Sequence, residues 1–221
     1  MADSLFRRPT SLILTRPNEV ADYTRSNIGV EVAVIEAAIV AGASDAAMVT
    51  AHNAASSYGY RFWDGLVASL RDQLVPHGWR SERPGQLEVV RRADNRLQIT
   101  GSLGDDAVGV ESGDPNCRHD KGESTDAAVR VNQLTLAGSS NGDPGWLPML
   151  TWWILYRFSG PTERRVTAEL SLLREGSGGR ITDWAVRLLL PTFDLDGGEF
   201  DRLELPEPPA PVDFSVRRLS S

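Results

Sequence analysis

The chain has 221 residues, of which 41% are hydrophobic and 24% are charged, so it can bury one sizeable core without help from disulfides or metal ions. The formal net charge of −7 and the pI near 5.0 exclude a protein that binds nucleic acid over its whole surface, because such surfaces are basic. The single cysteine, Cys117, excludes an internal disulfide framework.

The N-terminal part of the chain has the pattern of neither a signal peptide nor a membrane span. Residues 1–8 lack a continuous apolar stretch. The most hydrophobic segment, residues 30–49, is interrupted by Glu31, Glu36 and Asp45. We therefore expect a soluble, cytoplasmic protein that makes no contact with a membrane.

Helices are predicted in the first third of the chain. Apolar residues are dense from Val30 to Ala43, and this density favours a buried helix that ends at Gly42. Ser44 and Asp45 are then expected to cap a second, shorter helix.

The clearest amphipathic pattern spans residues 58–75. Phe62, Leu66 and Leu70 recur every four residues and form one apolar row, whereas charged residues occupy the remaining face. Pro76 follows the last turn. The pattern predicts a helix that packs on the core.

Strands are predicted after Trp79, where the hydrophobic period changes from 3.6 to 2. Residues 87–92 and 96–100 read as a β-hairpin. The remaining strand candidates, separated by short turns rich in glycine, are residues 149–158, 164–173 and 180–190. Such short connections predict antiparallel neighbours, because a parallel crossover needs a dozen or more residues.

These elements predict an α+β fold in which N-terminal helices pack on a mainly antiparallel sheet of about five strands. We expect residues 1–192 to form a single α+β domain, with an acidic loop, residues 104–126, at one edge of the sheet. Residues 193–221 contain four prolines with Asp and Glu, so this tail is expected to be extended or disordered.

The leading functional hypothesis is a non-catalytic binding or regulatory module. Trp152 and Trp153 are adjacent in a predicted strand, so their side chains point to opposite faces of the sheet. One of them is expected to lie exposed on an open face, where it can stack on a ring or a base. Arg91 and Arg92 add a local basic patch, so the expected partner is a protein or a nucleic acid.

The alternative hypothesis is a metal-dependent hydrolase, most plausibly a nuclease. Asp105, Asp106 and Glu111 supply hard oxygen donors for Mg²⁺ or Mn²⁺, and these three residues are the predicted metal ligands. Lys121 is the only lysine among 23 basic residues, which suggests that its compact ammonium is needed as a fourth catalytic group.

One feature of the sequence departs from this alternative. Restriction-type nucleases place an acidic residue two positions before the lysine, where this chain has His119. No phosphate-binding glycine loop or zinc motif occurs either, so no cofactor is predicted unless the hydrolase hypothesis holds.

Overall fold

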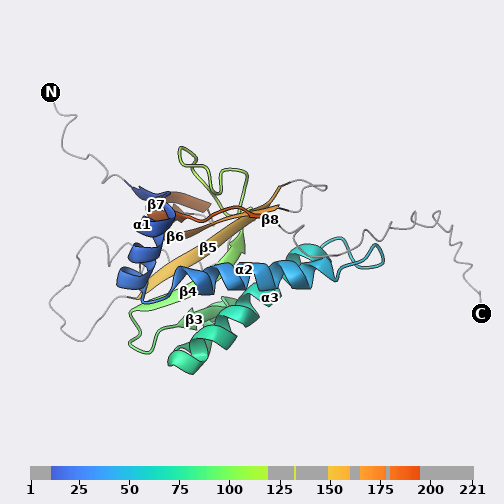
Figure 1. Ribbon diagram of the computed structural model, residues 1–221, viewed down its shortest axis with the longest axis horizontal. Coiled ribbons are helices and arrows are strands. Elements are labelled where there is room, and N and C mark those ends of the chain that lie inside the picture. The colour runs from blue at the N-terminus through green and yellow to red at the C-terminus, as the bar shows by residue number, and fades with distance from the viewer. Residues whose placement is uncertain (1–10, 119–131, 133–148, 160–164, 178–179, 195–221) are drawn as a thin grey trace, which may run out of the picture.

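The computed structural model describes residues 11–118, 132, 149–159, 165–177 and 180–194. Within these residues the fold is α+β, as the sequence predicts, with helices on one side of a single mixed sheet (Figure 1). Lys121, most of the tail and residues 119–126 of the predicted acidic loop lie outside the described residues.

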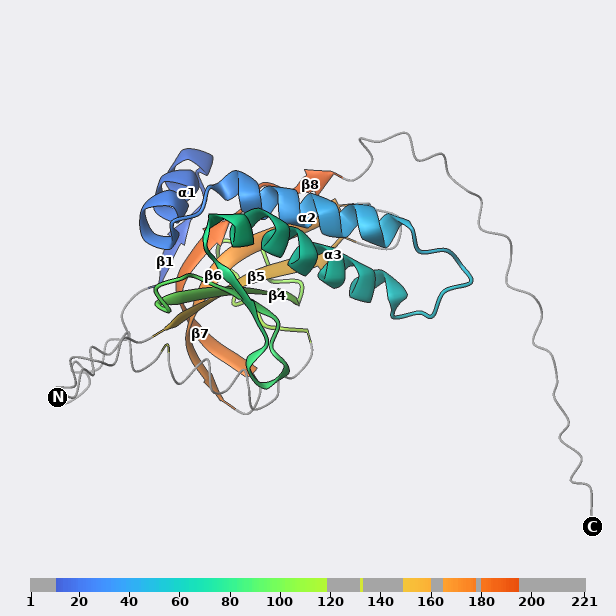
Figure 2. The ribbon, with the colours of Figure 1, turned by 90° about the horizontal axis from the view of Figure 1, so that it is seen from below.

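Three α-helices precede most of the sheet. They are α1 (Pro17–Tyr23), which continues as a π-helical turn (Thr24–Ile28), α2 (Val32–Ala47) and α3 (Ser57–Leu74). The prediction for α3 is confirmed to within one residue at each end. Figures 1 and 2 show α2 and α3 side by side along one side of the sheet.

The break predicted at Gly42 is wrong, because α2 runs on through Ser44 and Asp45 to Ala47. Gly42 is buried where α2 meets α3, and a Cβ atom at this position would lie 2.5 Å from the carbonyl oxygen of Phe62. The glycine therefore permits a close approach of two helices rather than ending one. Gly65 does the same from the side of α3, facing the Asp45 side chain.

The strands are β1 (Leu12–Leu14), β2 (Arg80–Glu82), β3 (Val89–Arg91), β4 (Leu97–Leu103), β5 (Leu150–Phe158), β6 (Arg165–Ser177), β7 (Arg180–Leu189) and β8 (Phe193–Asp194). Seven of them lie in the order β1-β7-β6-β5-β4-β3-β2, and β8 pairs with β6. The β3–β4 hairpin and the antiparallel β5–β6 and β6–β7 pairs agree with the prediction.

The sheet is larger and more mixed than predicted. β4 pairs with β5 in parallel, and β1 pairs with β7 in parallel. The parallel pairing of β4 with β5 is possible because the connection between them, residues 104–149, is long enough for a parallel crossover. The short strands β1 and β2 were not predicted, because three residues show too little periodicity.

The helix-facing side of the sheet holds the main core. Ile99, Trp152 and Ile154 from the strands pack with Ile39 and Leu66 from the helices, and all five are buried. This side uses alternate residues of β5, as the two-residue period of a strand requires.

The opposite side of the sheet is covered by residues 104–118. Val108 and Cys117 of this segment pack against Trp153, Leu155 and Trp184 in a second buried cluster, and Trp184 Nε1 donates to the Pro115 carbonyl at 2.8 Å. The segment therefore lies across the face of the sheet and not at an edge, where it was predicted.

An ion pair between two strands fixes this covering segment. Arg187 on β7 holds Glu169 on β6 through two contacts of 2.9 and 2.6 Å, and neither side chain is exposed. Arg187 also donates to the carbonyl oxygens of Gly113 and Val110, at 2.7 and 3.1 Å. Glu169 accepts from the Gly109 amide at 2.8 Å, so both charges bind the main chain of the segment.

No single helix among the described residues is long and apolar enough to cross a bilayer. Only α1 with its π-helical turn, taken together with α2 across a bend of 102°, has the required combined length and composition.

Candidate ligand-binding pocket

The predicted binding face is not open in the described part of the chain. Trp152 is 2% exposed in the helix-side core, and Trp153 is 0% exposed beneath residues 104–118. The two side chains do point to opposite faces, as expected, but the expectation that one of them is exposed is wrong. The physical reason is that the segment after β4 folds back over the second face.

The two predicted arginines are engaged within the protein. Arg91 contacts the Glu82 carboxylate at 2.5 Å and donates to Gln98 Oε1 at 3.0 Å. Arg92 holds the Asp94 carboxylate through Nε at 3.1 Å and donates to the Ile28 carbonyl at 3.0 Å. Both guanidinium groups thus fasten the β-hairpin to its neighbours.

The predicted metal ligands lie in the segment that covers the sheet. Asp105 accepts from the Ala107 amide at 3.1 Å, which is a local turn contact, and both Asp106 and Glu111 are exposed. The described residues contain no group of three or more His, Cys, Asp or Glu side chains that could hold a metal ion. Because Lys121 lies outside those residues, the hydrolase hypothesis stays a prediction.

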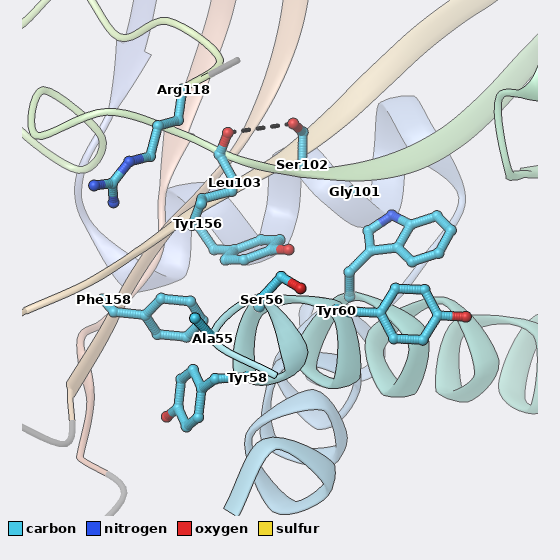
Figure 3. A pocket seen from close by; sticks show the side chains of 12 residues that line it. Ala55, Ser56, Tyr58, Tyr60, Gly101, Ser102, Leu103, Arg118, Tyr156 and Phe158 are labelled. Carbon is cyan, nitrogen blue, oxygen red and sulfur yellow. Dashed lines mark hydrogen bonds between the residues drawn. The ribbon is translucent and has the colours of Figure 1, made fainter. Parts of the chain in front are cut away.

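A pocket of about 640 Å³ lies elsewhere, between the start of α3 and the ends of β4 and β5 (Figure 3). Its described lining consists of Ala55, Ser56, Tyr58, Gly59, Tyr60, Trp63, Gly101, Ser102, Leu103, Arg118, Tyr156 and Phe158. Five of these twelve side chains are aromatic, and Arg118 is the only charged one. The size and the apolar walls are typical of sites for small ligands.

The aromatic wall is held in place by edge-to-face ring contacts. Phe158 contacts Tyr58, Phe62 and Tyr156 with ring centroids 5.0, 5.0 and 5.8 Å apart. Phe62 belongs to the apolar row of α3 and is fully buried, so it anchors this cluster to the core. Such contacts stabilise each ring in one orientation.

The other end of the lining is more exposed. Tyr60 is 60% exposed, and its ring centroid lies 6.0 Å from that of Trp63, one turn along α3. Aromatic side chains left partly in contact with solvent at a pocket are available to stack on a flat ligand.

Arg118 reaches the pocket because the covering segment returns beside β4. The Gly104 and Cys117 backbones form an antiparallel bridge, and the Arg118 amide donates to the Leu103 carbonyl at 3.0 Å. These contacts continue the pairing past the end of β4 and bring Arg118 next to Leu103.

Tyr156 lies between the two ends of the pocket. Figure 3 shows its ring between Arg118 on one side and Tyr60 on the other. Burial raises the pKa of the Tyr156 hydroxyl above its ordinary value of 10.0, so this group is a neutral hydrogen-bond donor across the physiological range.

No sequence pattern predicts this pocket, since its residues come from four separate segments. One pattern could have revealed part of it: Tyr58, Tyr60 and Trp63 cluster at the start of α3, beside the apolar row and not within it. The contribution of Arg118 depends on how residues 104–118 return, which no local pattern specifies.

The chain was compared with family models, with curated proteins and with solved structures, and none of these matches it.

Proposed function

We propose that this protein is a binding module for a small, largely apolar ligand, and that the ligand occupies the pocket between α3, β4 and β5. The observation that carries the proposal is the combination of a 640 Å³ volume with a lining of five aromatic side chains. The general idea of a binding module is the one reached from the sequence, but the site is moved from the sheet face to this pocket.

Two further features support the proposal. The inner rings are fixed by the buried Phe62 and Tyr156, so the walls are preorganised and little entropy is lost when a ligand enters. Gly59 leaves open space in the lining, because a Cβ atom at this position would meet nothing within 4 Å.

Gly59 also allows a direct test. In Gly59→Phe, the added ring is expected to fill part of the pocket without strain, since the helix has room at this position. The control is Ala68→Phe, which adds the same side chain to an exposed position of α3 outside the pocket lining. Binding is measured by the fluorescence of N-phenyl-1-naphthylamine, a neutral aromatic probe.

The proposal expects saturable binding by the wild type and by Ala68→Phe, with binding to Gly59→Phe weakened at least about tenfold. Equal probe affinity in all three proteins, or no saturable binding by the wild type, would show that the pocket is not a ligand site.

A further inference from the structure

The pocket combines an aromatic wall with one arginine whose charge is not neutralised within the described residues. Most described arginines have a carboxylate partner, and these are Arg16, Arg25, Arg71, Arg80, Arg83, Arg91, Arg92, Arg174 and Arg187. In the same part of the chain, the Arg118 guanidinium faces no carboxylate within 4.0 Å, and no acidic side chain lines the pocket.

From this arrangement we infer that the ligand is an aromatic carboxylate, with its ring against Tyr60 and Trp63 and its carboxylate on Arg118. This inference rests on the proposed function and adds the chemical class of the ligand. Charge complementarity carries it, because Arg118 is exposed at the pocket and the described lining holds no acidic side chain that competes with an anion for its guanidinium.

In the pocket lining, the residues proposed to bind the ring of the ligand lie apart from the arginine proposed to bind its carboxylate. Arg118 and Tyr60 lie on opposite sides of Tyr156 in Figure 3, so a molecule that reaches both must be elongated. Tyr156 lies between them, and Figure 3 shows its hydroxyl on the side of the ring that faces away from Arg118.

A carboxylate fits these residues better than a phosphate does. The two parallel N–H groups of one guanidinium match the two oxygens of a carboxylate, which carries a single charge. A phosphate dianion carries more charge than the one cation in the described lining can balance, and the whole chain has a net charge of −7. The inference therefore commits to the carboxylate.

The test compares three probes of similar shape: 1-naphthylacetate, its neutral amide 1-naphthylacetamide, and 1-naphthyl phosphate. Each is titrated into the full-length protein by calorimetry. The variants are Arg118→Gln and, as a control with the same change of charge, Arg96→Gln at the exposed hairpin turn. A third variant, Arg118→Lys, keeps the charge but removes the forked donor geometry.

We expect the wild type and Arg96→Gln to bind 1-naphthylacetate at least about tenfold more tightly than the amide, as a charge-assisted hydrogen bond implies. Arg118→Gln is expected to lose this preference while still binding the amide, and Arg118→Lys to retain only part of it. Retained binding of the amide also shows that the variant is folded.

Two results would overturn the inference without touching the proposed function. The first is saturable binding of acid and amide with equal affinity, which would show a purely apolar pocket. The second is tighter binding of 1-naphthyl phosphate than of 1-naphthylacetate, which would assign a phosphate ligand. Failure of the neutral naphthylamine probe to bind, in contrast, would refute the proposed function itself.

Discussion

The carboxylate of Glu169 and the guanidinium of Arg187 form a forked ion pair inside the sheet, and each group also binds the backbone of residues 109–113. A buried charge needs partners for all of its donors or acceptors, and here the covering segment supplies those that the two strands lack. The pair thus joins the sheet to the segment that closes its second face.

Breaking this pair is expected to destabilise the protein strongly. Glu169→Gln leaves the Arg187 charge buried without its counterion, so the free energy of unfolding should fall by about 3–5 kcal/mol. The control is Arg16→Met, which breaks the exposed ion pair with Glu19. This variant should change the free energy of unfolding by less than about 1 kcal/mol. Urea denaturation measures both, and equal effects would argue against a special role for the buried pair.

The same change is expected to loosen residues 104–118. With the Glu169–Arg187 clamp on this segment broken, limited proteolysis should cut the segment faster in Glu169→Gln than in the wild type under native conditions, since the backbone must leave the sheet to be cleaved. Mass spectrometry of the first fragments identifies the site of cleavage. First cuts outside residues 104–118 would contradict the assignment of the clamp.

A methyl group at Gly42 is expected to push the two long helices apart. In Gly42→Ala the new Cβ would lie 2.5 Å from the Phe62 carbonyl oxygen, so the variant should lose about 1–3 kcal/mol of stability. Gly59→Ala is a matched control in α3, because its Cβ meets open space and alanine favours a helix by about 1 kcal/mol. Thermal unfolding should rank Gly59→Ala above the wild type and Gly42→Ala below it.

Alkaline pH is expected to destabilise the protein through Tyr156. Burial raises the folded-state pKa of this hydroxyl, so between the unfolded pKa of about 10 and the higher folded value only the unfolded chain releases the proton. The stabilising contribution is complete below about pH 10 and is lost as the pH rises further. Tyr156→Phe should flatten this decline in denaturation midpoints, and parallel curves for the two proteins would refute the cause.

Acidic pH is expected to remove the contribution of the Arg92–Asp94 ion pair to the stability of the fold. The hydrogen bond from Arg92 lowers the folded-state pKa of Asp94 below its ordinary value of 3.8, so the pair stabilises the fold above that value and loses its effect as the pH falls through the lowered pKa. Because Asp94 is largely exposed, Asp94→Asn should cost less than about 1 kcal/mol at neutral pH. Denaturation curves of the two proteins should converge once the pH falls below the lowered pKa of Asp94, and a difference that persists there would have another origin.

Much of the fold could be predicted because strong local patterns determine it. The apolar row of Phe62, Leu66 and Leu70 specifies α3, and short glycine-rich turns specify the antiparallel pairing of β6 with its neighbours. Gly42 misled the prediction because a glycine that ends a helix and a glycine that admits a neighbouring helix look alike in sequence.

The candidate site could not be predicted, because contacts between distant segments create it. Arg118 joins Tyr58 and Phe158 in the pocket lining only after residues 104–118 have crossed the sheet and returned to Leu103. The same crossing buries Trp153, so one unforeseen path of the chain both removed the predicted surface and formed the pocket.

The Glu169–Arg187 clamp binds only backbone groups of residues 109–113. It makes no contact with the side chains of that segment. Val110, Glu111 and Ser112 are exposed, whereas the groups that Arg187 and Glu169 hold are carbonyl oxygens and an amide. Any residue compatible with the turn can therefore occupy these three positions, which makes the segment a natural place to graft short peptide epitopes. The two glycines of the segment are exceptions. The φ of +75° at Gly109 and its contact with Thr167 leave no room for a side chain, and a Cβ atom at Gly113 would lie 2.9 Å from the Ala107 carbonyl oxygen.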